Sequence, residues 1–290
     1  MVTATGLSDM VGVSAGHATL AEEKTGCTVI LFDHPALTAV DVRGAAPGTR
    51  ELDLLAPGRT VQAADAILLT GGSAFGLRAA DGVMRELAER GRGFPTSASP
   101  VPIVPAAVIY DLATGQPVAP EPEHGRQALI AAVPLSQVSQ GPVGAGTGAT
   151  WGKLPGGNHR EGGIGIAQFA VRAGKVTAIV VLNATGSLDG DHRESLLKLD
   201  QKTPDPGQAT TLISVITSTT CDHGTLSRMC VAAHDALARR VIPSHTMLDG
   251  DVAFASTTSS GTIEREHGFR LCIATELAVE AALLKAAGLD

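Results

Sequence analysis

A threonine between a polar turn and an apolar strand is the residue of this chain best placed to do chemistry. Thr210 follows the turn-forming segment Pro204–Gly207 and precedes TLISVIT, an apolar run rich in β-branched residues. If the chain is cut before Thr210, that residue gains a free α-amine beside its hydroxyl. An amine with a reference pKa of about 7.7–8.0 can accept the hydroxyl proton near neutral pH. The alternative is an ordinary threonine at the entrance of a strand, so the rest of the chain must decide.

Five further side chains suit amide chemistry, although each also has an ordinary structural explanation. Tyr110, the only tyrosine, could donate to an oxyanion or make a buried hydrogen bond. Asn183, at the end of a predicted strand, could donate to an oxyanion or cap a turn. Lys153 lies in a glycine-rich loop. It could point into a cleft as a functional cation, or it could be a solvated surface charge. Asp249 and Asp251, separated by one glycine, point to the same face of an extended segment, as a functional pair or as a solvated turn.

Two other kinds of active site have weaker support. Ser73 follows a predicted strand and opens a helical pattern, but the run GGSAF ends in Phe where a nucleophile elbow needs Gly. The same run lacks the lysine of a phosphate-binding loop, so a structural turn is favoured. His245 with Asp249 and Asp251 could ligate a cation, yet the histidines are scattered and form no metal-binding motif. We therefore expect neither a metal nor a cofactor.

Composition argues against several classes of partner. The chain has 290 residues, of which 44% are hydrophobic and 18% charged, as expected of a globular protein with a substantial core. A net charge of −7 and an aromatic content of 3% argue against nucleic-acid binding. The cysteines stand singly, which predicts reduced thiols. Neither a signal peptide nor an apolar run of ~18 residues is found, so we expect a soluble cytoplasmic protein without membrane contact.

Local patterns predict strands and helices in mixed order, which fits an α/β sandwich. Strands are expected within 8–19, 26–33, 65–70, 100–112, 167–171, 176–182, 210–217 and 244–258, and helices over 75–90, 125–133, 223–241 and 263–287. The loop 41–51 contains two arginines, which we expect to pair with nearby acids. The polar segment 186–208 reads as an exposed, cleavable linker that ends beside Thr210.

Six motifs in a fixed order make the sequence recognisable. They are VRGAAPGTRE at 42–51, AILLTGGSAFGLRAADGV at 66–83, PVPIVPAAVIYDL at 100–112, GAGTGATWGK at 144–153, TTLISVIT at 210–217 and HTMLDGD at 245–251. Through them the chain resembles the family of self-processing N-terminal-nucleophile aminopeptidases. That family includes DmpA-like L-aminopeptidase/D-esterases, β-peptidyl aminopeptidases and nylon-oligomer hydrolases. The resemblance covers almost the whole chain, and a threonine followed by Asp-Gly-Asp is nearest to the nylon-oligomer hydrolase branch.

The resemblance implies that the chain cuts itself. The expected cut lies between Ala209 and Thr210 and divides a single domain, residues 1–290, into segments of 1–209 and 210–290. Thr210 would then attack substrate amides and form an acyl-enzyme. Ala209 departs from the Asn or Gly expected before the nucleophile, although a small residue still permits attack on the preceding carbonyl.

The resemblance also implies a role for each of the other candidates. Tyr110 and Asn183 are the expected oxyanion donors, and Lys153 would lower the pKa of the nucleophile and stabilise negative charge. Asp249 and Asp251 would orient the Thr210 amine and Lys153, or bind a substrate ammonium.

The implied fold is a four-layer αββα sandwich like that of N-terminal-nucleophile hydrolases, assembled as a homo-oligomer, often a tetramer. The implied substrate is a small amide, a short peptide or an oligoamide, and its identity stays open between aminoacyl amides, β-peptides and aminohexanoate oligomers. A different class of function also stays open, namely an uncleaved, non-catalytic protein of the same fold that binds small molecules or serves in an assembly.

Overall fold

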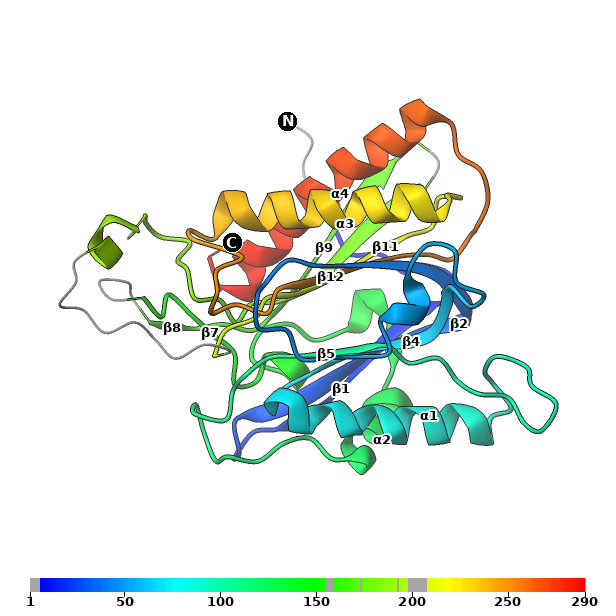
Figure 1. Cartoon of the computed structure of the whole chain (residues 1–290), viewed down its shortest axis with the longest axis horizontal. Helices are drawn as coiled ribbons and strands as arrows, with labels where there is room; N and C mark the ends of the chain where they lie inside the picture. The colour runs from blue at the N-terminus through cyan, green and yellow to red at the C-terminus, as the bar shows by residue number, and fades with distance from the viewer. Residues whose placement is uncertain (1–5, 155–158, 173, 192, 198–207, 290) are drawn as a thin grey trace.

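A strand of 18 residues, β2 (Thr25–Val42), connects the two halves of the sheet (Figure 1). The computed structural model describes residues 6–154, 159–172, 174–191, 193–197 and 208–289. The first part of β2 pairs with β1 (Val13–Leu20) and β4 (Ala63–Thr70), and its last part pairs with β12 (Val252–Thr257). The register with β4 shifts between Leu31 and Ala36, where Pro35 has no N–H to donate to a neighbouring strand. One continuous strand therefore takes part in both sheet layers.

The remaining strands extend the sheet on either side of β2. The main hydrogen-bonded order is β3-β5-β4-β2-β12-β11-β10-β9. The other strands of this sheet are β3 (Thr49–Arg50), β5 (Ala106–Val108), β6 (Val133–Pro134), β9 (Ile164–Val171), β10 (Gly174–Val181) and β11 (Leu212–Thr217). A separate two-stranded sheet is formed by β7 (Thr150–Trp151) and β8 (Arg160–Glu161). β11 and β12 run parallel, whereas β10 runs antiparallel to β11. The start of β11, the start of β12 and the end of β10 therefore lie at the same edge of the sheet.

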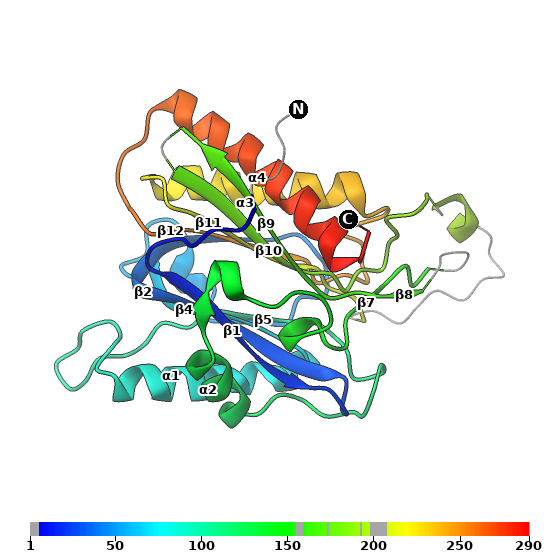
Figure 2. The same cartoon turned by 180° about the vertical axis from the view of Figure 1, so that it is seen from behind.

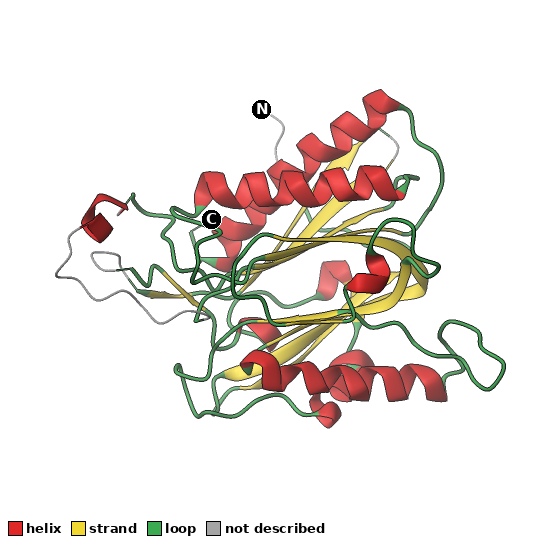
Figure 3. Ribbon diagram, in the orientation of Figure 1, coloured by secondary structure: helices red, strands yellow, loops and turns green. Residues whose placement is uncertain are grey.

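Helices cover both outer faces of the folded sheet (Figures 1 and 3). The helices α3 (His223–Arg240) and α4 (Arg265–Ala286) pack on the layer that contains β9 to β12, and the view from behind shows α4 lying across β9 and β10 (Figure 2). The helices α1 (Ala79–Glu89) and α2 (Pro122–Ile130) pack on the other layer. The predicted four-layer αββα sandwich is confirmed.

Alternation along the central strands explains the layers. In β11, Ile213 and Val215 pack toward α3 and α4, whereas Leu212 and Ile216 pack between the two sheet layers. Side chains alternate between the faces of a strand, so a strand that is apolar at every position must be covered on both faces. The sequence signal for this central position is that TLISVIT has apolar residues on both faces and no charged residue.

Several predicted boundaries move for identifiable reasons. Of the predicted strand at 100–112 only β5, Ala106–Val108, forms, because the prolines before it cannot donate ladder hydrogen bonds. The helix predicted at 125–133 begins earlier, at Pro122, where Glu121 and His124 form a capping box. The predicted strand at 8–19 begins only at Val13.

The linker predicted at 186–208 is partly wrong. Its first residues, Gly186 and Ser187, are buried, and Ser187 and Ile242 exchange main-chain hydrogen bonds of 2.9 and 3.1 Å. A short 3₁₀ helix, Arg193–Leu197, follows. Residues 198–207 lie outside the described residues.

Other expectations about charge and cysteine are confirmed. Arg43 pairs with Asp41 at 2.8 Å, and Arg50 pairs with Asp81 at 2.6 Å, so both loop arginines bind local acids. The cysteines are free thiols, three of them buried. Across the described residues, no helix combines the length and apolar character needed to cross a membrane.

Candidate active site

The predicted nucleophile lies where three strands meet at one edge of the sheet. Thr210 stands two residues before β11 and is 3% exposed. Its main-chain N–H donates to the carbonyl of Asn183, just past the end of β10, at 2.6 Å. Its hydroxyl donates to the carbonyl oxygen of Ala209 at 2.6 Å. The hydroxyl therefore lies against the peptide bond that the sequence predicts to be cut.

The carbonyl of Ala209 receives a second hydrogen bond. The main-chain N–H of Gly250, between the two predicted aspartates, donates to this oxygen at 2.9 Å. A methyl group at Gly250 would lie 2.6 Å from the carbonyl oxygen of Ala46 and 2.7 Å from the hydroxyl oxygen of Thr210. Glycine therefore allows this N–H and the Thr210 hydroxyl to approach the same carbonyl.

Asn183 connects most of the predicted site residues. Its side-chain oxygen accepts from the ammonium of Lys153 at 2.8 Å and from the N–H of Thr150 at 3.0 Å. Its side-chain nitrogen donates to the main-chain carbonyl of Tyr110 at 3.2 Å. Because the main-chain carbonyl of Asn183 also accepts from the N–H of Thr210, the predicted tyrosine, lysine and threonine are joined through one fully buried residue.

Lys153 contacts the residue before Ala209, next to the bond that is predicted to be cut. Its ammonium donates to the carbonyl oxygen of Gln208 at 2.7 Å. Burial lowers the pKa of Lys153 from its usual value to about 7, although the negative charges of Asp249 and Asp111 oppose the shift. Near neutral pH the charged and neutral forms of the group are therefore both populated.

The two aspartates are buried, and the carboxylate of each accepts hydrogen bonds from main-chain N–H groups. Asp249 accepts from the N–H of Thr185 at 3.1 Å and from the N–H of Thr246 at 3.0 Å. Asp251 accepts from the N–H of Thr211, the neighbour of the predicted nucleophile, at 2.7 Å. Burial and the nearby charge of Asp251 raise the pKa of Asp249. All six predicted catalytic residues are thus brought into one connected cluster.

A histidine next to this cluster was not included among the predicted catalytic residues. Both the N–H and the ring Nδ1 of His245 bind Asp251, the ring at 2.8 Å. Burial lowers the pKa of His245, but the hydrogen bond and charge of Asp251 outweigh burial, so the net shift is upward. The histidine opens the HTMLDGD motif, which is the signal by which the sequence could have marked it. His245 binds the carboxylate itself, and the described residues contain no group of three or more His, Cys, Asp or Glu able to hold a metal ion.

Asp111, the buried residue that follows Tyr110, is a second residue near the site that is not among the predicted catalytic residues. Asp111 accepts from the N–H of Gly72 at 2.6 Å and from the hydroxyl of Thr25 at 2.7 Å, and burial raises its pKa. It thereby holds the turn that carries Ser73, which has a left-handed φ of 53°. The sequence places Asp111 directly after the predicted Tyr110, but its type gave no indication of which backbone it would bind.

A small pocket opens directly onto Thr210. Its volume is about 160 Å³, and Ser73, Tyr110 and Val108 line it together with the loop 46–48. Ser73, the alternative nucleophile, lies in the same pocket as Thr210. Within the described chain, neither the Ser73 hydroxyl nor the Tyr110 hydroxyl has a hydrogen-bond partner in the protein, so both can bind a substrate.

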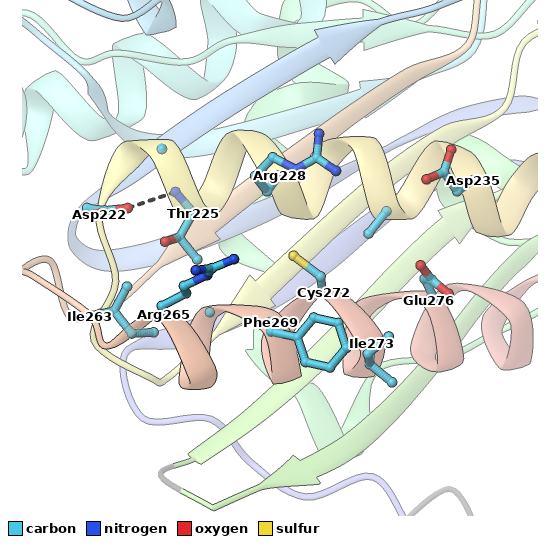
Figure 4. Close-up of a pocket in the computed structure, with 13 residues that line it drawn as sticks. Asp222, Thr225, Arg228, Asp235, Ile263, Arg265, Phe269, Cys272, Ile273 and Glu276 are labelled. Carbon is cyan, nitrogen blue, oxygen red and sulfur yellow. Dashed lines mark hydrogen bonds between the residues drawn. The ribbon is translucent and has the colours of Figure 1, made fainter.

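A larger pocket lies elsewhere, in the groove between α3 and α4 (Figure 4). Its volume is about 530 Å³, and Arg228, Arg265, Phe269 and Cys272 are among the residues that line it. None of the predicted catalytic residues lines this groove. The cluster around Thr210, which combines a nucleophile, hydrogen-bond donors and groups with shifted pKa values, is therefore the better candidate for an active site.

The sequence matches peptidase family S58 over residues 5–287. The chain belongs to peptidase family S58. An uncharacterized aminopeptidase of Mycobacterium leprae is 39% identical to this S58 member over 290 residues, covering 88% of this chain and 78% of that protein. A 6-aminohexanoate-oligomer endohydrolase of a Kocuria species is 33% identical over 272 residues, covering 86% of this chain and 74% of that protein.

The fold of this S58 member is similar to that of a solved structure. The L-aminopeptidase D-Ala-esterase/amidase of Ochrobactrum anthropi, described as a variant of the N-terminal-nucleophile hydrolase fold, superposes with a TM-score of 0.78 at 18% identity. The match covers 98% of this chain and 88% of that one. Family membership and these relatives establish that the S58 member is a hydrolase of amide or peptide bonds.

Proposed function

We propose that this protein is a self-processing amide hydrolase whose nucleophile is Thr210, released as an N-terminal residue by cleavage of the Ala209–Thr210 bond. The observation that carries the proposal is the environment of the Ala209 carbonyl. The Thr210 hydroxyl lies 2.6 Å from its oxygen, and the Gly250 N–H donates to the same oxygen at 2.9 Å. A donor already aimed at this oxygen would stabilise the negative charge that forms there during attack.

In the processing step, the Thr210 oxygen attacks the carbonyl carbon of Ala209. The bond from that carbon to the Thr210 nitrogen breaks, and the nitrogen takes up a proton and becomes a free amine. The resulting ester joins Ala209 to the Thr210 oxygen, and water hydrolyses it to a carboxylate on Ala209 and a free hydroxyl on Thr210.

In substrate turnover, the same oxygen attacks an amide carbonyl of the substrate and the Thr210 amine serves as base. Lys153 stabilises negative charge near the nucleophile, and its contacts with Asn183 and Gln208 support this assignment. Tyr110 donates to the oxyanion from the wall of the Thr210 pocket, a role supported by its unpartnered hydroxyl in the described chain.

The remaining candidates take part by positioning. Asn183 holds both Lys153 and the Thr210 nitrogen, and Asp251 holds the neighbouring nitrogen of Thr211. Binding of a substrate ammonium by the aspartate pair has less support, because Asp249 and Asp251 are each 1% exposed and already bind protein donors.

The proposed substrate is a small amide, a short peptide or an oligoamide. The curated relatives include proteins named as aminopeptidases and as 6-aminohexanoate-oligomer endohydrolases. The proposed location is the cytoplasm, and the proposed assembly is a homo-oligomer.

A denaturing gel with N-terminal sequencing tests the proposal directly. The purified wild-type protein is expected to give two fragments, the smaller beginning TTLIS, whereas Thr210→Ala should remain intact and lose at least 10³-fold in activity. Thr210→Ser keeps a hydroxyl and should be cleaved. Ser73→Ala, a change in the same pocket, is the control and should be cleaved normally. Amide hydrolysis that survives in Thr210→Ala and disappears in Ser73→Ala would overturn the assignment.

A further inference from the structure

Two groups of His245 bind one carboxylate next to Thr210. The main-chain N–H and the ring Nδ1 of His245 both lie against Oδ2 of Asp251, at 3.1 and 2.8 Å. The other oxygen of this carboxylate, Oδ1, accepts from the N–H of Thr211 at 2.7 Å. His245 has a left-handed φ of 55°, which is uncommon for a residue other than glycine. Such a backbone conformation persists where the surrounding contacts require it, and it often occurs at functional sites.

The partners of the His245 ring are those of an imidazolium. Both oxygens of Asp251 accept from main-chain N–H groups, so Nδ1 faces an acceptor. The second ring nitrogen, Nε2, faces the main-chain carbonyl oxygen of His234 at 3.4 Å, and a carbonyl oxygen only accepts. Only the charged ring has a proton to donate from each nitrogen. Burial opposes the charge, but the hydrogen bond and charge of Asp251 leave the pKa of His245 above its usual value.

The neighbouring histidine on α3 is neutral. The ring of His234 lies edge-to-face against that of His245, with centroids 4.8 Å apart. Its Nε2 faces the main-chain carbonyl of Asp41 at 3.1 Å and so carries a proton, whereas its buried Nδ1 has no hydrogen-bond partner within the described chain. Burial lowers the pKa of His234 to about 4, although the charge of Asp41, which pairs with Arg43, opposes the shift. The charge of the histidine pair therefore lies on His245.

The buried carboxylates favour this assignment. Asp251 touches the His245 ring, and the charge of Asp249 adds a smaller attraction. Lys153, the other buried cation of the cluster, is attracted to Asp249 and Asp111. His245 is thus the cation in direct contact with Asp251, and a hydrogen bond between two charged groups is stronger than one between neutral groups.

The carboxylate that His245 holds also fixes the position of the proposed nucleophile. The N–H of Thr210 donates to the carbonyl of Asn183, and the next N–H, that of Thr211, donates to Asp251. Because peptide groups are planar, these two bonds hold the peptide planes on both sides of the Thr210 Cα. The proposed cleavage converts the first plane into a free amine, so the bond from Thr211 to Asp251 then holds the nucleophile from the other side.

We infer that His245 is a positioning residue, which as an imidazolium fixes the Asp251 carboxylate and thereby holds Thr210 in place for self-cleavage and for turnover. The inference rests on the proposed function, with Thr210 as the nucleophile. A neutral ring would hold the carboxylate less firmly, so the reaction should be slower when His245 has lost its charge.

Self-cleavage at different pH values tests the inference, because the chain is its own substrate. The uncut chain is made by cell-free translation, collected in urea and diluted into buffers between pH 6.5 and pH 9.5, and the fragment that begins TTLIS is followed on a gel. The variant is His245→Asn, since asparagine offers a neutral donor close to the position of Nδ1 and also tolerates a left-handed φ. The matched control is His267→Asn, a half-buried histidine of α4 that lies 3.8 Å from Glu264 and should be cut like the wild type.

At pH 6.5 the His245→Asn chain should be cut at least about tenfold more slowly than the wild type, as when a reacting group is slightly misplaced. A raised pKa means that the contribution of the charge is complete below the usual value of 6.5 and is lost as the pH rises through the raised value. The difference should therefore shrink to less than about threefold at pH 9.5. A side chain with only a structural part would give the same ratio at every pH. A constant ratio, or equal rates at pH 6.5, would overturn the inference.

The charge of the ring can be measured without replacing it. In the uncut Thr210→Ala protein with ¹⁵N-labelled histidine, NMR reports which ring nitrogens carry protons. At pH 6.5 more than half of the His245 rings should carry both protons, whereas His234 should carry one. A mainly neutral His245 ring at this pH would overturn the inference, even if His245→Asn failed to fold.

The wild-type chain gives a further test that needs no variant at His245. At alkaline pH its rate of self-cleavage should decline with the same midpoint as the NMR titration of His245. The absence of a decline, or a different midpoint, would contradict the inference.

The wild-type chain also separates this inference from the proposed function. If it stays uncut at every pH, or if N-terminal sequencing finds a different cut, the proposed function is wrong. If it is cut before Thr210 and His245→Asn is cut at the same rate throughout, only the inference about His245 is wrong.

Discussion

Individual side chains of the candidate site can be predicted from the sequence, but their hydrogen-bond partners cannot. The types and motifs single out Thr210, Lys153 and Asn183, and the structure joins them through short hydrogen bonds. The sequence offers no way to foresee that Asp251 would bind the N–H of Thr211, because hydrogen bonds between distant segments depend on the folded backbone. The same reason explains why Asp111 was overlooked.

The buried lysine makes stability depend on pH. Lys153 has a pKa of about 7 in the folded chain, against a usual value of 10.5, so the unfolded chain binds one more proton between these values. The free energy of unfolding should therefore rise between pH 7 and pH 9, by about 2 kcal/mol at most at 1.36 kcal/mol per pKa unit. Urea unfolding of Thr210→Ala, which keeps the chain uncut, measures the change.

The control for this prediction is Lys153→Met in the same Thr210→Ala background. The variant lacks the ionisable group, so its free energy of unfolding should change less between the two pH values. An equal rise in both proteins would show that other groups cause the dependence.

At the scale of elements, the candidate active site is formed by residues at the ends of strands. Thr210 precedes β11, Gly250 precedes β12 and Asn183 follows β10, and the parallel and antiparallel pairing brings these ends together. Hydrophobic patterns predicted the strands around Thr210 and Asn183, and the hairpin of β9 with β10, because these segments are rich in apolar and β-branched residues and are bounded by clear turns. Patterns could not predict the strand order, since it depends on pairing between segments far apart in the sequence.

The close approach of β12 to the cleavage segment predicts the effect of a single methyl group. Gly250→Ala would bring a methyl within 2.7 Å of the Thr210 hydroxyl oxygen, so the segment must shift and lose the hydrogen bond to Ala209. We expect processing to slow by about 10- to 10³-fold, as for loss of one oxyanion donor. A time course of fragment appearance on a gel, from cells sampled after induction, measures it.

Gly268→Ala is the matched control for this change. Gly268 lies in α4, its added methyl would make only ordinary contacts at 3.6 Å, and alanine is favoured within a helix. Processing should proceed at the wild-type rate. A similar delay in both variants would mean that the Gly250 position has no special part in cleavage.

For the molecule as a whole, the sequence-based resemblance identified the layers correctly, whereas local patterns alone indicated only an α/β sandwich. No sequence pattern predicted the full length of β2. The patterns predict a strand at 26–33 and a separate loop after it, whereas β2 runs from Thr25 to Val42 in the structure. Its central residues Asp33, His34 and Pro35 are exposed and polar or β-breaking, so local rules end the strand there, while pairing on both sides continues it.

The assembly of the molecule stays a prediction. We propose a homo-tetramer, which static light scattering would report as four times the 29.5 kDa of one chain. Phe269, 65% exposed, and Ile273, 42% exposed, line the groove between α3 and α4 and offer apolar surface of the kind that assembly buries. A mass of one chain at micromolar concentration would contradict the prediction.

The central position of β11 requires that folding come before the proposed cleavage. β11 and β12, which both follow the proposed cut, lie between β10 and β2, which both precede it. The strands beside the proposed nucleophile can take their places only if the whole chain has folded first, so the proposed cut must come after folding. Once it is made, the two pieces remain interleaved, yet unfolding separates chains that no longer share a backbone. Maturation would thus turn a reversible folding reaction into one whose product persists because it unfolds slowly.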